Sequence, residues 1–157
     1  MNTIINYLLS IACFACIYLF HRFLFNASQA IYIIAAFGAS AVLVFSNNSI
    51  KHSPLKIFLS SVLAAFIGVF LNGFDLALII KVILAISSCI LIMNLINTSY
   101  PPAGAITLIP ILSNSEIESL GYWYILYPTI TGLLIIYSFS ILRDILKTHL
   151  NTLNYGK

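Results

Sequence analysis

The chain has 157 residues, of which 61% are hydrophobic and only 7% are charged, far from the composition of a soluble globular domain. Its four acidic and seven basic side chains are too few to cover a soluble surface. The composition predicts a membrane protein and excludes a soluble enzyme with a single anchor. The net charge of +3, spread without a basic patch, also excludes nucleic acid as a partner.

Six apolar runs separated by polar or turn residues predict the membrane elements, at residues 4–20, 28–45, 57–71, 76–96, 101–112 and 122–142. The first run lacks the basic start and the cleavage site of a signal peptide, so we interpret it as a membrane helix. The fifth run would reach only about 18 Å as a helix, which is too short for a hydrocarbon core of about 30 Å. We therefore expect an all-α polytopic transmembrane bundle of five full helices plus one short broken or re-entrant segment. Residues 1–145 form the expected membrane domain and residues 146–157 a short cytoplasmic tail.

The charges favour six crossings, with residues 97–112 counted as one of them. Both termini then share one side with five basic residues, and the acidic loop residues fall on the other side. This bias predicts cytoplasmic termini in a cell membrane, with the bacterial inner membrane as the expected location. If residues 101–112 turn back instead, five crossings result and the asymmetry is blurred.

A pairing of the two halves is suggested by Gly38-Ala39 and Gly104-Ala105. Each pair precedes an apolar stretch that ends in serines and asparagines. Duplication of a unit with three crossings produces an inverted 3+3 repeat, as in many secondary transporters. The similarity is short, so a repeat and its absence both stay open.

The most informative segment is 97–105, with the sequence NTSYPPAGA. The two prolines predict extended backbone from Ser99 through Pro102, with a helix that begins at Pro102 or Ala103. Broken backbone at membrane depth is tolerated where protein or a watery cavity covers it, and free amides at a helix start suit a small anion. The candidate site therefore consists of Tyr100, Pro101, Pro102, Ala103, Gly104 and Ala105, with Gly38, Ala39 and Ser40 as a second small-residue stretch and Asn94 and Asn97 as donors.

Close helix packing is the alternative for every small residue in this set, because Gly and Ala most often let membrane helices approach each other. We favour packing slightly for residues 38–41 and the functional reading for residues 101–105. Ser60, Ala64 and Gly68 recur every four residues and predict a helix contact without a ligand. Pro128 is expected to kink the last helix.

Enzymatic chemistry has little support in the sequence. The three histidines are expected in loops or the tail, the four acids lie at or beyond helix ends, and no phosphate-binding or dinucleotide motif is present. Cys13 and Cys16 stand alone, without the second pair that a structural metal site needs. We expect no catalytic residue, no metal and no cofactor.

Three stretches carry a family resemblance: AFGASAVLVF at 36–45, SPL at 53–55 and PPAGA at 101–105. Their order and spacing resemble the HPP family of integral membrane proteins. The resemblance implies a small multi-helix membrane domain and a transporter, with nitrite transport attributed to some members of the family. Two departures matter, because Tyr100 stands where the family has the histidine of His-Pro-Pro, and Lys56 is the local substitute for a basic residue that follows the SPL stretch.

The sequence thus favours a membrane transporter or channel for a small inorganic anion, with nitrite as the anion that the resemblance implies. We expect a homodimer or higher homo-oligomer, because a chain this small has little surface with which to enclose a path. Without an acid or histidine at depth, uniport is the expected mode. The alternative function is a non-transporting interaction or regulatory subunit of the membrane.

Overall fold

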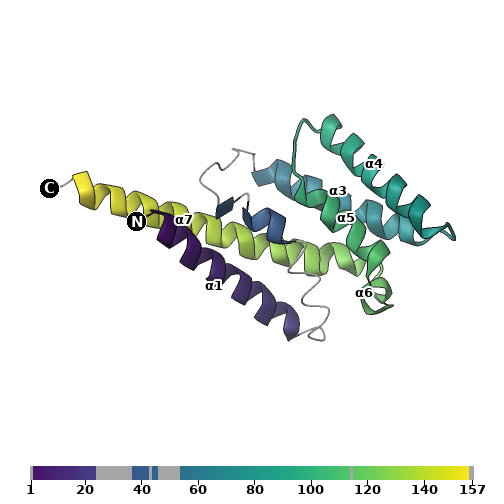
Figure 1. The fold of residues 1–157 in the computed structure, drawn as a ribbon, viewed down its shortest axis with the longest axis horizontal. Coiled ribbons are helices and arrows are strands. Elements are labelled where there is room, and N and C mark those ends of the chain that lie inside the picture. The colour runs from purple at the N-terminus through teal and green to yellow at the C-terminus, as the bar shows by residue number, and fades with distance from the viewer. Residues whose placement is uncertain (1, 24–36, 43, 46–53, 114, 156–157) are drawn as a thin grey trace.

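The computed structural model describes residues 2–23, 37–42, 44–45, 54–113 and 115–155, and these residues are largely helical. Residues 37–42 and 44–45 are helical, and we refer to these described residues together as the 37–45 helix. The other elements are shown in Figure 1, and in chain order they are α1 (Asn2–Arg22), α3 (Pro54–Asn72), α4 (Leu78–Leu95), α5 (Pro102–Leu112), α6 (Ser115–Ser119), η1 (Ile125–Ile130) and α7 (Thr131–Tyr155).

The predicted all-α polytopic fold is confirmed. Among the described residues, four helices are long and apolar enough to cross a membrane, at Ile4–Arg22, Leu55–Asn72, Leu78–Leu95 and Ile125–His149, and Pro102–Leu112 is a shorter apolar helix. The third predicted run extends through Lys56 because Pro54 starts its helix one turn earlier. Much of the predicted run 28–45 lies outside the described residues.

Two parts of the chain differ from the expected elements. Helix α7 continues to Tyr155, through the residues expected to form a tail, because no proline or glycine interrupts the sequence after Gly132 until residue 156. The short helix α6 was not predicted, because five residues are too few to show a helical period.

Residues 97–118, which include α5, carry the chain from the first turn of α3 to its last turn. At the start of this stretch, Lys56 Nζ of α3 donates to the carbonyl oxygen of Asn97 at 3.1 Å. At its end, Asn72 Nδ2 at the other end of α3 donates to Glu118 Oε1 at 3.2 Å. Residues 97–112 therefore run alongside α3 in the same direction, as the six-element arrangement requires.

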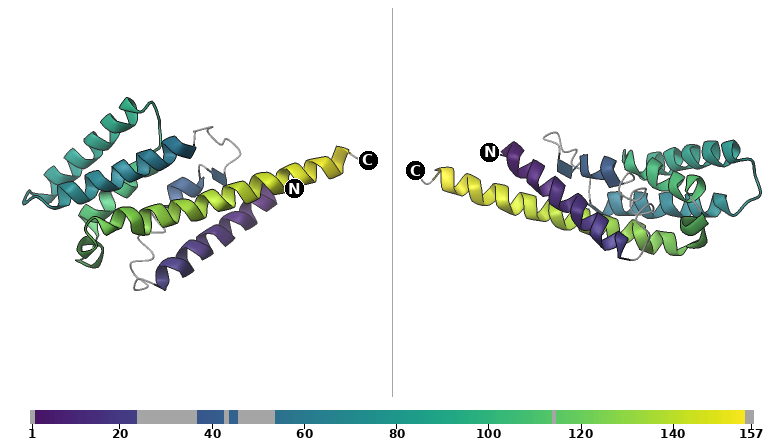
Figure 2. Two further views of the ribbon diagram at one scale, coloured as in Figure 1. Left: turned by 180° about the vertical axis from the view of Figure 1, so that it is seen from behind. Right: turned by 60° about the horizontal axis from the view of Figure 1, so that its bottom comes forward.

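The bundle has two distinct ends (Figures 1 and 2). The start of α1 and the end of α7 lie toward one end of the molecule, which we call the termini end, and α3 starts near the middle of the molecule's length and runs away from that end. Asn72 and α6 lie toward the opposite end, which we call the α6 end. Helix α1 packs antiparallel to α7, and α3, α4 and α5 all pack against one another.

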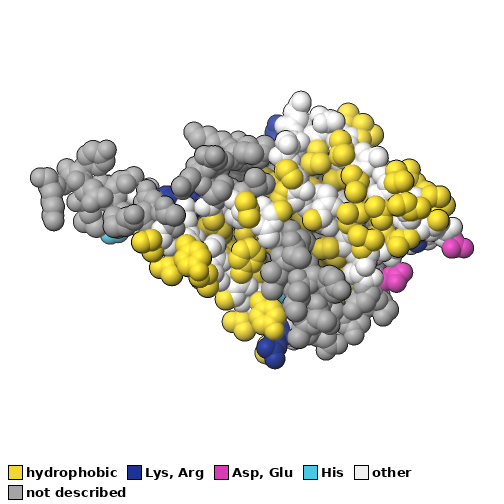
Figure 3. Space-filling view, in the orientation of Figure 1, with side chains coloured by type: hydrophobic (Ala, Val, Ile, Leu, Met, Phe, Trp, Pro, Cys, Tyr) yellow, Lys and Arg dark blue, Asp and Glu magenta, His cyan; other side chains and the backbone are white. Residues whose placement is uncertain are grey.

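Large apolar side chains cover the outside of the described helices, as a lipid environment requires. In α4 the buried residues are the small Ala85 and Cys89, whereas Leu78, Ile79 and Leu95 are exposed. Hydrophobic side chains spread over the face shown in Figure 3, and acidic side chains gather toward the α6 end. Among the described residues, the interior therefore holds small and polar groups more than the surface does.

The helix that leads into α7 is interrupted, as Pro128 predicts. Tyr127 has non-helical backbone angles (φ −140°, ψ 116°) within η1. A proline amide cannot donate to the helical ladder, so the turn is distorted there. The interruption lies near the α6 end, at the entry to the longest helix.

Candidate functional site

The segment before α5 meets the 37–45 helix through one buried hydrogen bond. Tyr100 Oη donates to Ser40 Oγ at 2.7 Å, across 60 residues of sequence. Tyr100 is 3% exposed and Ser40 is 1% exposed, and the buried Ser61 of α3 contributes a third side chain to this polar contact. The two sequence stretches singled out as candidate sites are thus brought together.

The two short helices leave this meeting point in opposite directions (Figure 1). Helix α5 runs toward the α6 end, whereas the 37–45 helix runs toward the termini end, where Asn6 of α1 donates to the Phe45 carbonyl at 3.1 Å. The described part of the 37–45 helix therefore lies beside the start of α5, inside the bundle. An inverted repeat predicts this antiparallel relation, and an alternating bundle without a repeat produces it too, so the repeat stays a prediction.

The start of α5 differs from the sequence prediction in one respect. The helix begins at Pro102, as expected, but Pro101 has helical angles (φ −53°, ψ −33°) where extended backbone was predicted. The restriction on a residue before proline is a preference, and here a tight first turn overrides it. In that turn the Ala103 amide donates to the Tyr100 carbonyl and the Gly104 amide to the Pro101 carbonyl, each at 3.0 Å.

The expectation of free amides at Ala103 and Gly104 is therefore wrong for this conformation. Both make the short i to i−3 contacts that are common at helix starts. The positive end of the helix dipole remains in place whether or not these contacts form. A bound anion at this point would draw on the dipole and on the nearby hydroxyl groups as well as on the amides.

The space beside each glycine shows whether it serves close helix packing or is available to a functional site. An added Cβ at half-buried Gly38 or Gly104 would meet no atom of the described residues within 4 Å. At Gly68 it would collide with the Thr107 carbonyl of α5, and at Gly132 with the Phe37 ring. Gly68 and Gly132 thus permit close packing, whereas no close approach explains Gly38 or Gly104 within the described chain.

The small-residue stripe on α3 is confirmed as a helix contact. Ser60 and Ala64 are 2% and 1% exposed, and Gly68 is buried against α5. The Ser60 hydroxyl donates to the Lys56 carbonyl of its own helix at 2.7 Å, which leaves the stripe smooth for packing.

The predicted amide donors, Asn94 and Asn97, lie at the surface, whereas the hydroxyl groups of Ser40 and Tyr100 are buried. Asn94 and Asn97 have exposed side chains, and Asn97 has φ of 49°, where it turns the chain out of α4. Between them and Tyr100, Thr98 is 8% exposed, and its Oγ1 has no hydrogen-bond partner among the described residues. A buried donor without a partner is costly, so Thr98 joins the candidate site. The sequence already places Thr98 at helical spacing from Asn94, on the face that leads into the Pro-Pro break, although the candidate set above does not include it.

Two polar side chains that the sequence analysis left outside the site hold the far end of the 37–45 helix. Arg143 Nη1 donates to the Val44 carbonyl, and Asn6 binds the next carbonyl along. Arg143 also pairs with Asp144 at 2.7 Å. Sequence reasoning treated Arg143 as a topology charge only, because its carbonyl partner is 99 residues away.

His21 is buried within the bundle, contrary to the expectation that the histidines lie in loops or the tail. It is 0% exposed, lies within α1 and stacks on the Tyr127 ring at a centroid distance of 5.3 Å. The apolar run ends just before it, which is why sequence reasoning placed it outside the helix. His149 also lies within a helix, α7, although its side chain is exposed.

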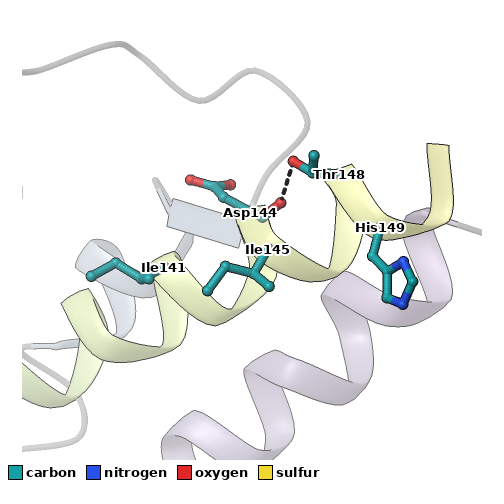
Figure 4. Close-up of a pocket in the computed structure, with 5 residues that line it drawn as sticks. All are labelled: Ile141, Asp144, Ile145, Thr148 and His149. Atoms are coloured by element: carbon teal, nitrogen blue, oxygen red, sulfur yellow. Dashed lines mark hydrogen bonds between the residues drawn. The ribbon is translucent and has the colours of Figure 1, made fainter. Parts of the chain in front are cut away.

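Two surface hollows lie elsewhere. One, of about 540 Å³, is open on α7 around Asp144 and Thr148, where the Thr148 hydroxyl donates to the Asp144 carbonyl at 2.9 Å (Figure 4). The other, of about 280 Å³, lies at the α6 end beside Asn72 and Glu118. Neither includes a residue of the 97–105 segment.

The fold and the lipid-compatible surface define a polytopic helical membrane protein. The sequence profile described as "HPP, transmembrane region" matches residues 1–150, so the chain belongs to the HPP transmembrane family. A transmembrane protein of Dictyostelium discoideum is similar, with 32% identity over 111 residues. That match covers 66% of this chain and 38% of the relative, so the chain spans well under half of the relative's length. No solved structure matches the chain.

Proposed function

We propose that this protein is a transporter or channel for a small inorganic anion, with nitrite as the first candidate. The observation that carries the proposal is the Tyr100–Ser40 contact, which joins the start of α5 to the antiparallel 37–45 helix inside a membrane bundle. Many secondary transporters bind substrate where broken helices meet near the midplane. Membership of the HPP family supports a membrane transporter in general, and the anion is our own inference.

The chemistry around this contact suits an anion. The positive end of the α5 dipole faces the region, and the hydroxyl groups of Ser40, Ser61, Thr98 and Tyr100 offer donors. Lys56 Nζ donates to the carbonyl of Asn97, the first residue of the 97–105 segment. A cation there would raise the local concentration of anions before they enter.

The proposal also covers the orientation of the protein in the membrane and its oligomeric state. We propose cytoplasmic termini in a bacterial inner membrane, because Lys56 and Lys147 then lie on the cytoplasmic side. We propose a homodimer or higher homo-oligomer, in which the open sides of Gly38 and Gly104 face the path. The proposal includes no enzymatic step and no cofactor.

The direct test is anion uptake into proteoliposomes of the purified protein. Uptake of nitrite is compared with that of nitrate, formate and chloride, and protein-free vesicles provide the baseline. Saturable uptake with a preference among the four anions would support the proposal. Absence of uptake of all four, from protein shown to be folded and inserted, would contradict it and favour the alternative of a membrane interaction subunit.

Gly104→Leu tests the location of the site. The position has open space, so the variant should fold and assemble normally while the leucine side chain fills the region beside the α5 start. Ser138→Leu is the matched control, because it adds a leucine at an exposed position of α7. Loss of uptake in Gly104→Leu alone would support the site, and equal uptake in both variants would contradict it.

A further inference from the structure

We infer that His21 is a proton-binding residue that couples proton movement to the anion path. The inference rests on the proposed transport function and replaces the expectation of uniport with proton-linked transport. It begins from the position of the ring, which is buried in α1 against the interrupted turn η1. A buried ionisable side chain inside a membrane bundle is rare and commonly marks a proton relay.

The hydrogen-bond geometry of the ring determines where its protons lie. His21 Nδ1 is 2.7 Å from the Ile17 carbonyl oxygen, which can only accept, so Nδ1 carries a hydrogen. His21 Nε2 is 3.4 Å from Thr131 Oγ1. The Thr131 hydroxyl itself donates to the Pro128 carbonyl at 3.0 Å.

The Thr131 hydroxyl can accommodate either protonation state of the ring by changing its hydrogen-bond partner. Thr131 has a single hydroxyl hydrogen, and while Pro128 receives it, Thr131 can only accept from His21. In the imidazolium form Nε2–H donates to Thr131 and all three contacts are satisfied. In the neutral form Nε2 accepts the Thr131 hydrogen, and the Pro128 carbonyl keeps the Thr131 backbone N–H as its donor, so protonation changes the partner of the Thr131 hydroxyl.

The side chains that surround the His21 ring are mainly aromatic or hydroxyl groups, so the imidazole is the group among them that binds a proton near neutral pH. From η1 the facing titratable group is the Tyr127 phenol, whose ring stacks on the imidazole. From α1 itself the neighbours are the Phe20 ring, at a centroid distance of 5.6 Å, and Arg22, whose guanidinium lies over Tyr18. Among the described contacts of His21, the partners on η1 and α7 are uncharged.

A continuous series of contacts leads from His21 to the candidate anion site. Thr131 precedes Gly132, against which the Phe37 ring packs so closely that a Cβ would collide. Phe37 begins the helical stretch that carries Ser40, the partner of Tyr100. A change in the Thr131 hydrogen bond at the kink therefore acts on the element that positions Ser40, and we assign the coupling to this connection.

A spectroscopic test is independent of transport. The purified protein, labelled with ¹⁵N in histidine and glycine, is titrated between pH 5 and pH 8 in lipid nanodiscs, and the His21 signals are assigned with His21→Gln. We expect the His21 ring nitrogens to titrate and the Gly132 amide signal to move with them. Thr131→Val should remove the movement at Gly132. A His21 ring that keeps one protonation state throughout, or a Gly132 signal that moves equally in Thr131→Val, would overturn the inference.

A transport test addresses coupling. For one proton per anion, an inward gradient of one pH unit can support up to about tenfold accumulation of nitrite. Because nitrous acid crosses lipid by itself, protein-free vesicles under the same gradient give the baseline. We expect faster gradient-driven uptake with the wild-type protein and His149→Gln, the matched control on α7, and loss of the gradient's effect in His21→Gln. A wild-type rate unaffected by the gradient, or a gradient effect retained in His21→Gln, would overturn the coupling.

The outcomes separate the two proposals. Absence of anion uptake by the wild-type protein at every pH would contradict the transport function, and with it the coupling. Uptake that is equal with and without the gradient would leave the transporter supported and overturn only the role of His21.

Discussion

The hydroxyl group of Tyr100 donates to that of Ser40, and this contact joins the two halves of the chain inside the bundle. Each residue lies within four positions of a glycine, Gly38 or Gly104, and an added Cβ at either glycine would meet no atom of the described residues within 4 Å. A hydroxyl pair of this kind can exchange its mutual bond for bonds to a ligand. The contact therefore serves as a marker for the candidate site and as the first target for mutation.

Tyr100→Phe removes the donor and leaves the ring. We expect a loss of about 0.5–1.5 kcal/mol in the free energy of unfolding, which is typical of one hydrogen bond, and a lower affinity for the transported anion. Thermal unfolding in detergent and the concentration dependence of uptake measure the two effects. In combination with Ser40→Ala the losses should be less than additive. Unchanged uptake in Tyr100→Phe would remove the phenol from the site.

Alanine at two glycines should separate packing from function. Gly68→Ala places a Cβ against the Thr107 carbonyl, so we expect destabilisation by about 1–3 kcal/mol. Gly104→Ala meets no described atom within 4 Å and should leave thermal stability nearly unchanged. Comparable loss of stability in the two variants would show that Gly104 also serves packing.

Arg143 should stabilise the protein through a carbonyl rather than through its ion pair. The Arg143 side chain is 10% exposed and Asp144 is 63% exposed, so solvent screens the ion pair. Arg143→Met leaves the Val44 carbonyl without its donor and should lower the free energy of unfolding by about 1.5–3 kcal/mol. Asp144→Asn should change it by less than about 0.5 kcal/mol. Thermal unfolding of both variants shows which substitution destabilises the protein more. A larger effect of Asp144→Asn would show that the ion pair, and not the carbonyl contact, provides the stabilisation.

Lys56 should affect how easily anions enter. Lys56→Gln removes a positive charge beside the Asn97 carbonyl, so we expect a KM that is several-fold higher with a similar maximal rate. The difference should shrink at high ionic strength, because salt screens exposed charges. Lys81→Gln is the matched control, since Lys81 Nζ donates to the Asn72 carbonyl at 3.0 Å toward the α6 end. Equal effects of the two variants would exclude a local role for Lys56.

Local pattern was sufficient to predict much of this protein. Long apolar runs determined α1, α3 and α4 to within a few residues, because a membrane helix needs a continuous apolar segment of a set length. Pro102 marked the start of α5 and Pro128 the interruption before α7, since proline acts on its own backbone. The stripe around Gly68 indicated a helix contact through spacing alone.

The tertiary structure decided what depends on partners distant in sequence. The sequence shows Gly38, Gly68, Gly104 and Gly132 as similar residues, and only packing shows which of them are in close contact. The burial of His21 requires α1 to lie against the interrupted turn of another helix. The Tyr100–Ser40 bond likewise requires two short helices to meet, and no local rule on backbone or composition encodes such a meeting.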